Sequence, residues 1–312
     1  MHIDILVLNY NGAAYISDCI RSLLEAVKHS SHHCQILMID NKSSDPSIRI
    51  IESQFPQVKI VAMGDNRVLC AFNDAVAESQ AEVVFLLNND VKADPYFIDP
   101  LVSVFKEKKD AFLVAAKSFL FDGSYEGGKS VPLVSFGLFK TTCRFAGFEK
   151  EVDEPGITFA AGFGAFDRLK FLELGGFDDL YLPGRLEDTD LAFRAWKKGW
   201  KSYYQPKSIL YHLGAKSFKD RFGVRGTNEL AHRNTFLFMW KNIRSPNYLS
   251  AHFVFLIPRL LWALLRLQTE FVTGFWKALG SVKPALARRQ LDGKVNYRYS
   301  DREIIAVFNH AH

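Results

Sequence analysis

Three polar residues, Asn88, Asn89 and Asp90, end a continuous apolar run and are the first side chains suited to chemistry. The run, residues 83–87, is typical of a strand buried on both faces of a mostly parallel sheet. Ligands bind at the carboxyl edge of such sheets, so a rigid strand would carry Asp90 to a site. Carboxylate oxygens suit Mg²⁺ and Mn²⁺, which makes Asp90 a candidate metal ligand. The alternative is that the three residues cap the next helix.

A second acidic group, Glu187, Asp188 and Asp190, lies in the first turn of a predicted amphipathic helix. Carboxylates at this position interact favourably with the helix dipole, so a structural role is one interpretation. Further along, His212 ends a predicted strand over residues 208–212 on an imidazole. The residues alone leave the chemistry of both groups open.

The elements that would position these residues alternate between strand and helix. Apolar runs predict strands over residues 3–8, 35–39, 58–62 and 82–87, and helices over 14–28, after Pro46 and from about 67 to 79. This alternation implies right-handed crossovers and a parallel sheet, hence an α/β fold. The loops at Asn9, Asp40 and Asn88 would then emerge at one edge of the sheet.

The second half of the chain gives weaker patterns. It predicts helices over residues 95–108 and 169–174 and a strand over 112–116, but no element over 119–151. Small residues in 159–166 allow either close approach of a ligand or tight packing. Neither of the two common glycine-rich phosphate-binding loops occurs, so a metal held by Asp90 is the natural group to neutralise bound phosphate.

Composition indicates a cytosolic chain. Its 312 residues contain four cysteines without paired or metal-type spacing, which suits a reducing compartment. The N-terminus lacks the pattern of a secretory signal, and no 18 successive residues are apolar without a charge, so we expect no membrane crossing. Residues 1–200 have a net charge of −7 and residues 201–312 a net charge of +12, so the two parts are expected to meet different partners.

The order of these motifs resembles the family 2 glycosyltransferases, inverting enzymes of GT-A fold, and within them the branch of bacterial rhamnosyl- and related polysaccharide transferases. The resemblance spans about residues 3–218. It is carried by Asn9-Tyr10-Asn11-Gly12, Ile39-Asp40-Asn41, Ser44-Asp45, Asn66 with Asn73, Leu86-Leu87-Asn88-Asn89-Asp90, Gly175-Gly176-Phe177-Asp178, Glu187-Asp188-Thr189-Asp190-Leu191, Arg194 with Gly199, and His212-Leu213-Gly214.

The resemblance implies a role for each site residue. Asp90 would hold a Mg²⁺ or Mn²⁺ ion that bridges the diphosphate of a nucleotide-sugar donor, and His212 would either complete the metal site or have a structural role. Donor-binding residues would be Asn9, Tyr10, Asp40, Asn66, Asn88 and Asn89, with Asp40 on the nucleobase and Asn88 on the ribose.

Asp188 is the predicted catalytic base. Inverting transfer needs a carboxylate on the acceptor side to take the hydroxyl proton, and Asp188 holds that position in the family pattern. Glu187 would position the loop or the acceptor, and Asp190 would have no chemical role.

The sequence departs from the family pattern at two places. Only one carboxylate remains in the Asn88-Asn89-Asp90 motif, which predicts weaker metal affinity. Val68 stands where relatives usually have glycine, and its neighbour Arg67 either reaches a phosphate or lies in solvent.

Residues 219–312 are predicted to form a basic, helical extension of a catalytic domain over 1–218, whose donor half covers about 1–95 and acceptor half about 96–218. Residues 219–245 are interpreted either as a loop that closes over the diphosphate or as a solvated surface. Over residues 249–279, five polar or charged side chains fall within about 20° of one line on a helical wheel, and the rest are largely apolar. This helix would lie in a membrane interface or pack on the catalytic domain or on a second subunit of a homodimer.

The sequence therefore predicts a metal-dependent inverting glycosyltransferase that transfers a sugar from a nucleotide diphosphate to a hydroxyl of a glycan or lipid-linked glycan. It would act in the cytoplasm, with the cytoplasmic face of the membrane as a further location. Nucleic acid is not an expected partner, because the basic residues stand among bulky aliphatics. A sugar-phosphate nucleotidyltransferase and a binding-only relative remain as alternatives.

Overall fold

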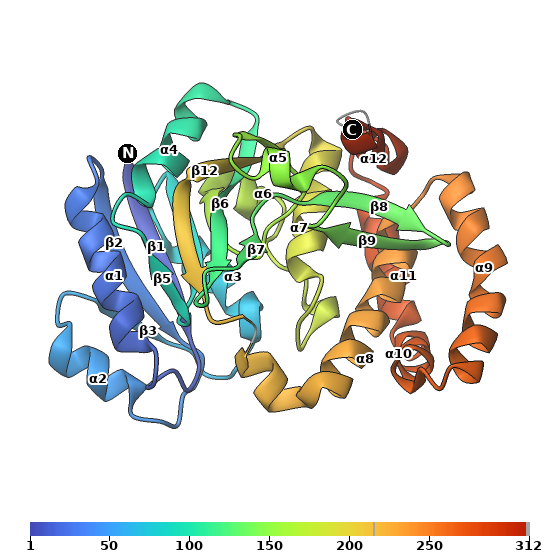
Figure 1. Cartoon of the computed structure of the whole chain (residues 1–312), viewed down its shortest axis with the longest axis horizontal. Coiled ribbons are helices and arrows are strands. Elements are labelled where there is room, and N and C mark those ends of the chain that lie inside the picture. Colours follow the sequence, from blue (N-terminus) through green and yellow to red (C-terminus); the bar gives the residue numbers. More distant parts are fainter. Residues whose placement is uncertain (215, 310–312) are drawn as a thin grey trace.

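A computed structural model of the chain describes residues 1–214 and 216–309 (Figure 1). Ten strands of this described part form one mixed sheet in the order β10-β12-β6-β11-β4-β1-β2-β3, with β5 added to β12 and β7 added to β6. Their bounds are β1 His2–Asn9, β2 His33–Asp40, β3 Lys59–Ala62, β4 Val83–Asn88, β5 Val91–Ala93, β6 Ala111–Leu120, β7 Tyr125–Gly127, β10 Gly156–Thr158, β11 Gly164–Asp167 and β12 Lys201–His212.

The four N-terminal strands are parallel and confirm the predicted α/β pattern. In the sheet register Asn9 faces Asp40, and Leu8 faces Asn88, so the three predicted loops do leave the sheet at one edge. Successive β1 residues are buried on opposite faces, as expected for a strand covered by helices on both sides. The helices of this half are α1 Ile16–His29, α2 Ser47–Gln54 and α3 Ala71–Glu78, the last preceded by the 3₁₀ turn η1 Val68–Cys70.

The other half of the sheet is mixed, because β11 runs antiparallel to both β4 and β6, whereas β6 and β12 are parallel. Its helices are α4 Ile98–Glu107, α6 Arg168–Glu173 and α7 Glu187–Lys198, with a 3₁₀ turn η2 at Asp179–Tyr181. The stretch 119–151, for which the sequence predicts no element, contains β7, the hairpin of β8 Val131–Ser135 and β9 Leu138–Thr142, and the short helix α5 Phe148–Glu151.

Five helices follow the sheet: α8 Lys216–Asn242, α9 Pro246–Leu265, α10 Thr269–Leu279, α11 Val282–Asp292 and α12 Asp301–Asn309. α8 is kinked at Gly223, whose φ of 66° lies outside the helical range. The prediction of a single helix over residues 249–279 is wrong. The chain leaves helical geometry at Arg266 and turns at Leu267, which has a φ of 54°, so α9 and α10 are separate helices.

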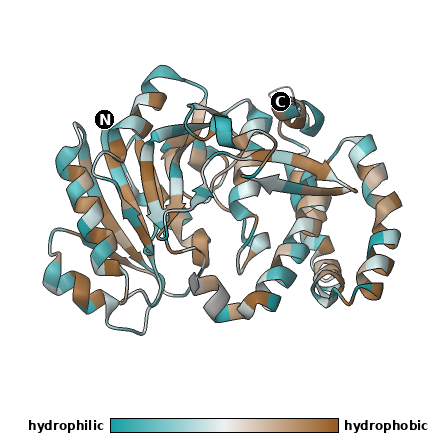
Figure 2. Ribbon diagram, in the orientation of Figure 1, coloured by the Kyte–Doolittle hydropathy of each residue, from teal (hydrophilic) through white to brown (hydrophobic). Residues whose placement is uncertain are grey.

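The C-terminal helices share a core with the second half of the sheet domain. Buried residues of α8 and α12 pack with the β8–β9 hairpin and with Phe193 and Trp196 of α7. Figure 2 shows the sheet strands largely in the colours of apolar residues, and Figure 1 shows α9 at the far end of the molecule from β1–β3. The predicted boundary at residue 218 therefore crosses a continuous core, and the division into a catalytic domain over 1–218 and an extension over 219–312 stays a prediction. Residues 310–312 of that extension lie outside the described part.

Candidate active site

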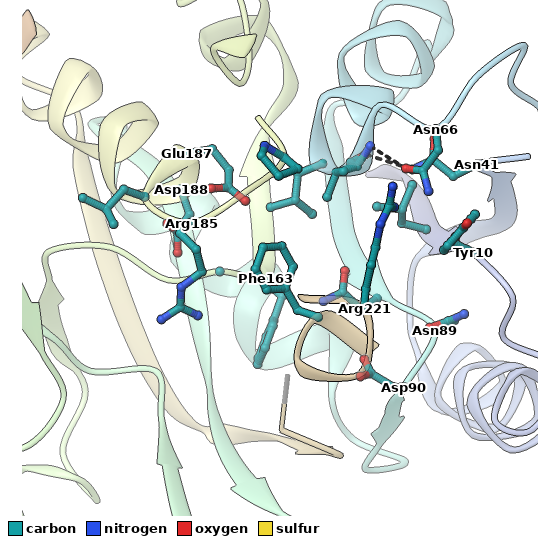
Figure 3. Close-up of a pocket in the computed structure, with 18 of the residues that line it drawn as sticks. Tyr10, Asn41, Asn66, Asn89, Asp90, Phe163, Arg185, Glu187, Asp188 and Arg221 are labelled. Carbon is teal, nitrogen blue, oxygen red and sulfur yellow. Dashed lines mark hydrogen bonds between the residues drawn. The ribbon is translucent and has the colours of Figure 1, made fainter. Parts of the chain in front are cut away.

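A pocket of about 440 Å³ opens at the carboxyl ends of β1 and β4 and faces the start of α7 (Figure 3). It is built from segments far apart in the chain, and Asp90 and Asp188 both line it. Seven of the nine predicted site residues are among its lining: Tyr10, Asn66, Asn88, Asn89, Asp90, Asp188 and His212. The predicted metal ligand Asp90 and the predicted base Asp188 therefore share one pocket, although they are far apart in the chain.

The other two predicted residues, Asn9 and Asp40, are buried beneath the pocket. Asn9 is fully buried, and its amide donates to the Asp40 carboxylate at 3.0 Å and to the Ser47 hydroxyl at 2.9 Å. In turn, the Asn89 amide donates to the side-chain oxygen Oδ1 of Asn9 at 2.7 Å. Asn9 and Asp40 thus connect the three loops, and in this arrangement Asp40 does not face the pocket as a nucleobase contact would.

Gly12 is required by this cluster. A side-chain carbon at Gly12 would lie 1.9 Å from Asn89 Nδ2 and 2.3 Å from Asn9 Oδ1. Any larger residue would therefore push the loop after β1 away from the loop after β4. Asn41 forms part of the pocket wall. Its side chain accepts a hydrogen bond from the Arg67 backbone N–H at 3.2 Å and donates one to the Val68 carbonyl at 3.1 Å. Asn41 was not among the predicted site residues, although it directly follows Asp40.

The candidate metal ligands Asp90 and His212 face each other, with His212 Nε2 at 3.4 Å from Asp90 Oδ1. Asp90 Oδ1 is buried and receives no hydrogen bond. On its other side His212 Nδ1 lies 2.7 Å from the Glu126 carboxylate. Although burial alone would lower it, the pKa of His212 is raised to about 9 by Asp90 and Glu126.

A buried carboxylate oxygen without a hydrogen bond, opposite an imidazole, fits a divalent cation that would displace the imidazole proton, because carboxylate and neutral imidazole are both metal ligands and Glu126 orients the imidazole. Among the described residues, no group of three or more His, Cys, Asp or Glu is placed to hold a metal by itself. Oxygens from the donor's phosphates or from water would have to complete the coordination shell.

Glu187 and Asp188 begin α7 on the opposite side of the pocket. Asp188 is partly buried, and its Oδ1 accepts the Thr189 backbone N–H at 2.7 Å. Burial raises the pKa of Asp188 above its usual range. Burial and the nearby Asp188 charge raise the pKa of Glu187 to about 8, and Glu187 Oε2 has no hydrogen-bond partner. Burial thus favours the protonated form of both neighbouring carboxylates, which titrate as a coupled pair.

The loop that precedes Glu187 has a strained backbone. Arg185 and Leu186 are both left-handed, with φ of 79° and 71°, a conformation that is unfavourable for residues other than glycine. Asn234 of α8 supports the loop: its amide nitrogen lies 2.8 Å from three carbonyl oxygens, those of Tyr181, Gly184 and Arg185. The adjacent Arg233 donates to the Leu182 carbonyl at 2.9 Å. A helix from the C-terminal part thus holds the segment that presents Asp188.

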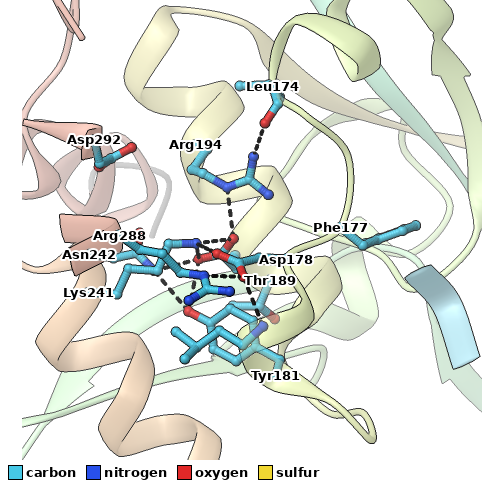
Figure 4. A network of polar contacts seen from close by, with 12 residues as sticks. Leu174, Phe177, Asp178, Tyr181, Thr189, Arg194, Lys241, Asn242, Arg288 and Asp292 are labelled. Atoms are coloured by element: carbon cyan, nitrogen blue, oxygen red, sulfur yellow. Dashed lines mark hydrogen bonds and ion pairs between the residues drawn. The ribbon is translucent and has the colours of Figure 1, made fainter. Parts of the chain in front are cut away.

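Asp190 anchors the same helix to α7 through partners that Figure 4 labels, among them Lys241 of α8 and Arg194 of α7. Its fully buried carboxylate accepts from Lys241 Nζ at 2.7 and 2.8 Å, from Arg194 Nε at 2.8 Å and from the Tyr181 hydroxyl at 2.9 Å. Burial alone would raise its pKa, but Lys241 and Arg194 hold the pKa of Asp190 well below its usual range. Asp190 therefore orients α7, in agreement with its predicted lack of a chemical role.

The pocket contains cations that the sequence did not single out as site residues. Arg221 of α8 lines it, with its guanidinium carbon 5.6 Å from the centre of the Tyr10 ring, and Arg185 lines it beside Asp188. Arg67, by contrast, pairs with Asp74 at 2.7 Å and does not line this pocket. Of the two predicted roles, the structure therefore supports the one in which Arg67 lies in solvent. Arg221 belongs to a stretch whose basic character was noted, but only the fold brings it to Tyr10.

Val68 lines the pocket in a left-handed conformation, with a φ of 50°. This is the position where the resemblance leads one to expect glycine, and a β-branched residue is strongly disfavoured there. The departure from the family pattern therefore falls on a strained residue.

Comparison with known proteins agrees with this architecture. Over 266 residues the chain is 23% identical to the N-acetylglucosaminyl-diphospho-decaprenol L-rhamnosyltransferase of Mycobacterium tuberculosis, covering 76% of this chain and 83% of the relative. Among solved structures it resembles residues 1–349 of TarS from S. aureus, with a TM-score of 0.54 and 11% identity over 100% of this chain and 92% of that one. It also resembles the mannosyltransferase PcManGT from Pyrobaculum calidifontis in complex with GDP-Man and Mn²⁺, with a TM-score of 0.53 and 15% identity over 91% and 77% of the two chains.

These structures share the GT-A fold with this chain. Residues 4–169, more than half of the sequence, match the model of the glycosyl transferase family 2. This match sets aside the nucleotidyltransferase alternative, and the chain belongs to glycosyl transferase family 2.

Proposed function

We propose that this glycosyltransferase is metal-dependent and inverting, and that it transfers a sugar from a nucleotide diphosphate to a hydroxyl of a glycan or lipid-linked glycan. One observation carries the proposal: the Asp90 carboxylate and the Asp188 carboxylate line the same pocket. They come from opposite sides of it, Asp90 after β4 and Asp188 at the start of α7.

In the proposed reaction Asp188 takes the proton of the acceptor hydroxyl. The acceptor oxygen bonds to the anomeric carbon while the bond from that carbon to the diphosphate breaks, and its electron pair leaves with the diphosphate. Attack from the face opposite the leaving group inverts the configuration. The hydrogen bond from the Thr189 N–H occupies Asp188 Oδ1 and leaves Oδ2 for the acceptor.

On the donor side, the chain offers polar side chains and one nearby cation. We assign Tyr10, Asn41, Asn66 and Asn88 to the nucleoside, since they line one end of the pocket, and Arg221 to the diphosphate. A divalent ion bound by Asp90 and His212 would add positive charge against the leaving diphosphate.

The acceptor class is taken from the similarity to the mycobacterial rhamnosyltransferase, whose name describes a lipid-linked acceptor. We propose a cytoplasmic enzyme that meets such an acceptor at the membrane surface. The donor's base and sugar are left to experiment.

Two measurements test this function. Thermal stabilisation by UDP, dTDP and GDP, each with and without Mn²⁺, should select one nucleotide, with a larger shift in the presence of metal. With that donor, Asp188→Asn should lower turnover by about 10²- to 10⁴-fold while donor binding stays near the wild-type value. Retained turnover would refute Asp188 as the base, and stabilisation independent of metal would refute the metal site.

A further inference from the structure

The helix α9 has its polar side inward and its apolar side outward. His252 is buried, and its ring lies 2.8 Å from the Gly137 carbonyl and 3.1 Å from Trp240 Nε1. Arg259 donates to the carbonyls of Ser135 and Phe136 at the turn of the β8–β9 hairpin. Two members of the polar line predicted on the helical wheel, His252 and Arg259, thus contact protein, the reverse of the usual arrangement for a surface helix.

The outward side of α9 is apolar over residues 253–265, its second and larger part. From residue 253 to residue 265, every exposed side chain is apolar: Phe253, Val254, Phe255, Ile257, Pro258, Leu261, Trp262, Leu264 and Leu265. Leu265 is 79% exposed and Ile257 is 60% exposed. We call this set the α9 outer face. A soluble monomer seldom exposes a contiguous apolar surface of this kind without a partner.

The width of the α9 outer face favours a fluid partner over a folded one. At 100° per residue its members cover an arc of roughly 200° of the helix circumference. A packed helix or sheet covers a stripe about 100° wide, whereas the acyl region of a bilayer closes around the whole arc.

Exposed tryptophan and basic side chains occur within the α9 outer face, directly after it and in α10. Trp262 is 55% exposed and carries Arg266 at 4.6 Å from its ring centre, and Trp276 of α10 is 65% exposed. Lys277 beside it is exposed and forms an ion pair with Glu229 of α8, so Arg266 is the basic side chain next to the face whose contact here is an aromatic ring. Trp with Lys and Arg is the combination that anchors protein at the headgroup level of anionic membranes.

The β8–β9 hairpin connects this surface to the pocket. Its turn packs on α9 through Phe136 and Phe255, whose ring centres are 5.6 Å apart, and Thr141 near its other end lines the pocket. Along a strand these points are separated by roughly 15 Å. A diphosphate-linked sugar held at the membrane could span such a distance.

By length and composition α9 could also cross a bilayer. Its inward contacts argue against that arrangement, because a spanning helix would lose the support of the hairpin and of α8. We propose that the α9 outer face inserts into the surface of an anionic lipid bilayer and lies in its plane, holding the pocket close to a lipid-linked acceptor. This inference rests on the proposed function for its acceptor, but the lipid contact is measurable without turnover.

The test is flotation of the full chain with vesicles of phosphatidylcholine, with and without phosphatidylglycerol. The wild type should float with the anionic vesicles. The double variant Leu261→Glu with Leu265→Glu should bind at least about tenfold more weakly, because two inserted side chains become charged. The matched control Leu169→Glu, at a 69% exposed leucine of α6, should float like the wild type.

Two further readouts separate the alternatives. Turnover on a water-soluble acceptor should be equal in the wild type and the double variant, so loss of membrane binding is not confused with failure of the proposed transfer. Brominated lipids should quench tryptophan fluorescence of the wild type, and less so in Trp262→Phe. Equal flotation of all three proteins, no flotation of the wild type, or a wild-type dimer that the double variant dissociates would overturn the proposal, the last by showing a second copy on this face.

Discussion

The two sides of the pocket are built in different ways. The donor side consists of loops that directly follow β1, β2 and β4, and its polar cluster of Asn9, Asp40 and Asn89 joins the ends of neighbouring strands. On the acceptor side, Asp188 depends on a strained loop that Asn234 of α8 supports, and on α7, which Lys241 of α8 holds through Asp190. The donor side is thus organised by sheet register, and the acceptor side by polar contacts between distant segments.

This difference has a physical basis. In a parallel sheet the strand ends are aligned by backbone hydrogen bonds, so residues at those ends meet without further help. The segment 182–186 has no sheet to align it, and two of its residues hold unfavourable dihedral angles. Surrounding structure has to stabilise such a loop.

The largest effect is expected from the buried charge network of the acceptor side. Lys241→Met leaves the Asp190 carboxylate with Arg194 as its only charged partner and should lower the free energy of unfolding by about 3–5 kcal/mol. Chemical denaturation measures this loss. The exposed pair of Lys28 and Glu25 supplies the control, since Lys28→Met should change stability by less than about 1 kcal/mol. Similar losses in both variants would contradict the comparison.

On the donor side, Asp90→Asn should weaken the metal-dependent part of donor binding by about 10- to 100-fold with little change in stability. The affinity for the nucleotide is measured by calorimetry with and without Mn²⁺. The control Asp74→Asn removes an exposed carboxylate that pairs with Arg67 outside the pocket and should bind donor normally. If Asp90→Asn keeps the full metal effect, the ion is held elsewhere.

Asn234→Ala should separate positioning from binding. Without its hydrogen bonds to the loop, Asp188 shifts relative to the donor, and kcat should fall by about 100-fold while the nucleotide affinity stays near that of the wild type. Asn234→Asp, which cannot donate to the three carbonyls, should be as impaired, whereas Asn234→Gln should recover part of the activity. An unchanged kcat would show that the loop keeps its conformation without α8.

Glu187 should give stability a pH dependence. Its pKa is about 8 in the folded chain against an ordinary value of 4.5, so folding favours its neutral form. The stabilisation is complete below about pH 4.5 and is lost as the pH rises through about 8. Between pH 5 and pH 9 the free energy of unfolding should fall less in Glu187→Gln than in the wild type. The exposed control Glu154→Gln should show the same fall as the wild type. Parallel pH curves for all three would contradict the raised pKa.

The smallest effect concerns Val68. Val68→Gly should relieve the strain of the left-handed backbone at this position. Glycine also gives the unfolded chain more conformational entropy, which offsets part of this gain, so the net stabilisation should be up to about 1 kcal/mol. Thermal unfolding measures the shift, with Val58→Gly, at a buried site of ordinary conformation, expected to destabilise. Destabilisation by Val68→Gly would mean that packing of the valine outweighs its backbone strain.

Much of the fold was predictable because its signals are local. The apolar runs of β1, β2 and β4, and the polar residues that end them, are properties of a few successive residues. For Asp188 and His212 the residues by themselves left structural and chemical roles open, and only the motif resemblance predicted a chemical role. The family match supports the enzyme class. The residues 119–151 gave no pattern, because the β8–β9 hairpin is stabilised by packing against α8 and α9.

The sequence alone determined that a parallel sheet carries polar loops to one edge, since strand periodicity and turn residues act over short distances. Only the tertiary structure decided that Asn9 and Asp40 lie beneath the pocket, that Arg221 meets Tyr10, and that α9 turns its apolar side outward. A helical wheel gives the relative positions of side chains around an axis but not the side that faces the protein. That orientation follows from which groups find partners elsewhere in the chain, here His252 and Arg259 on the turn of the hairpin.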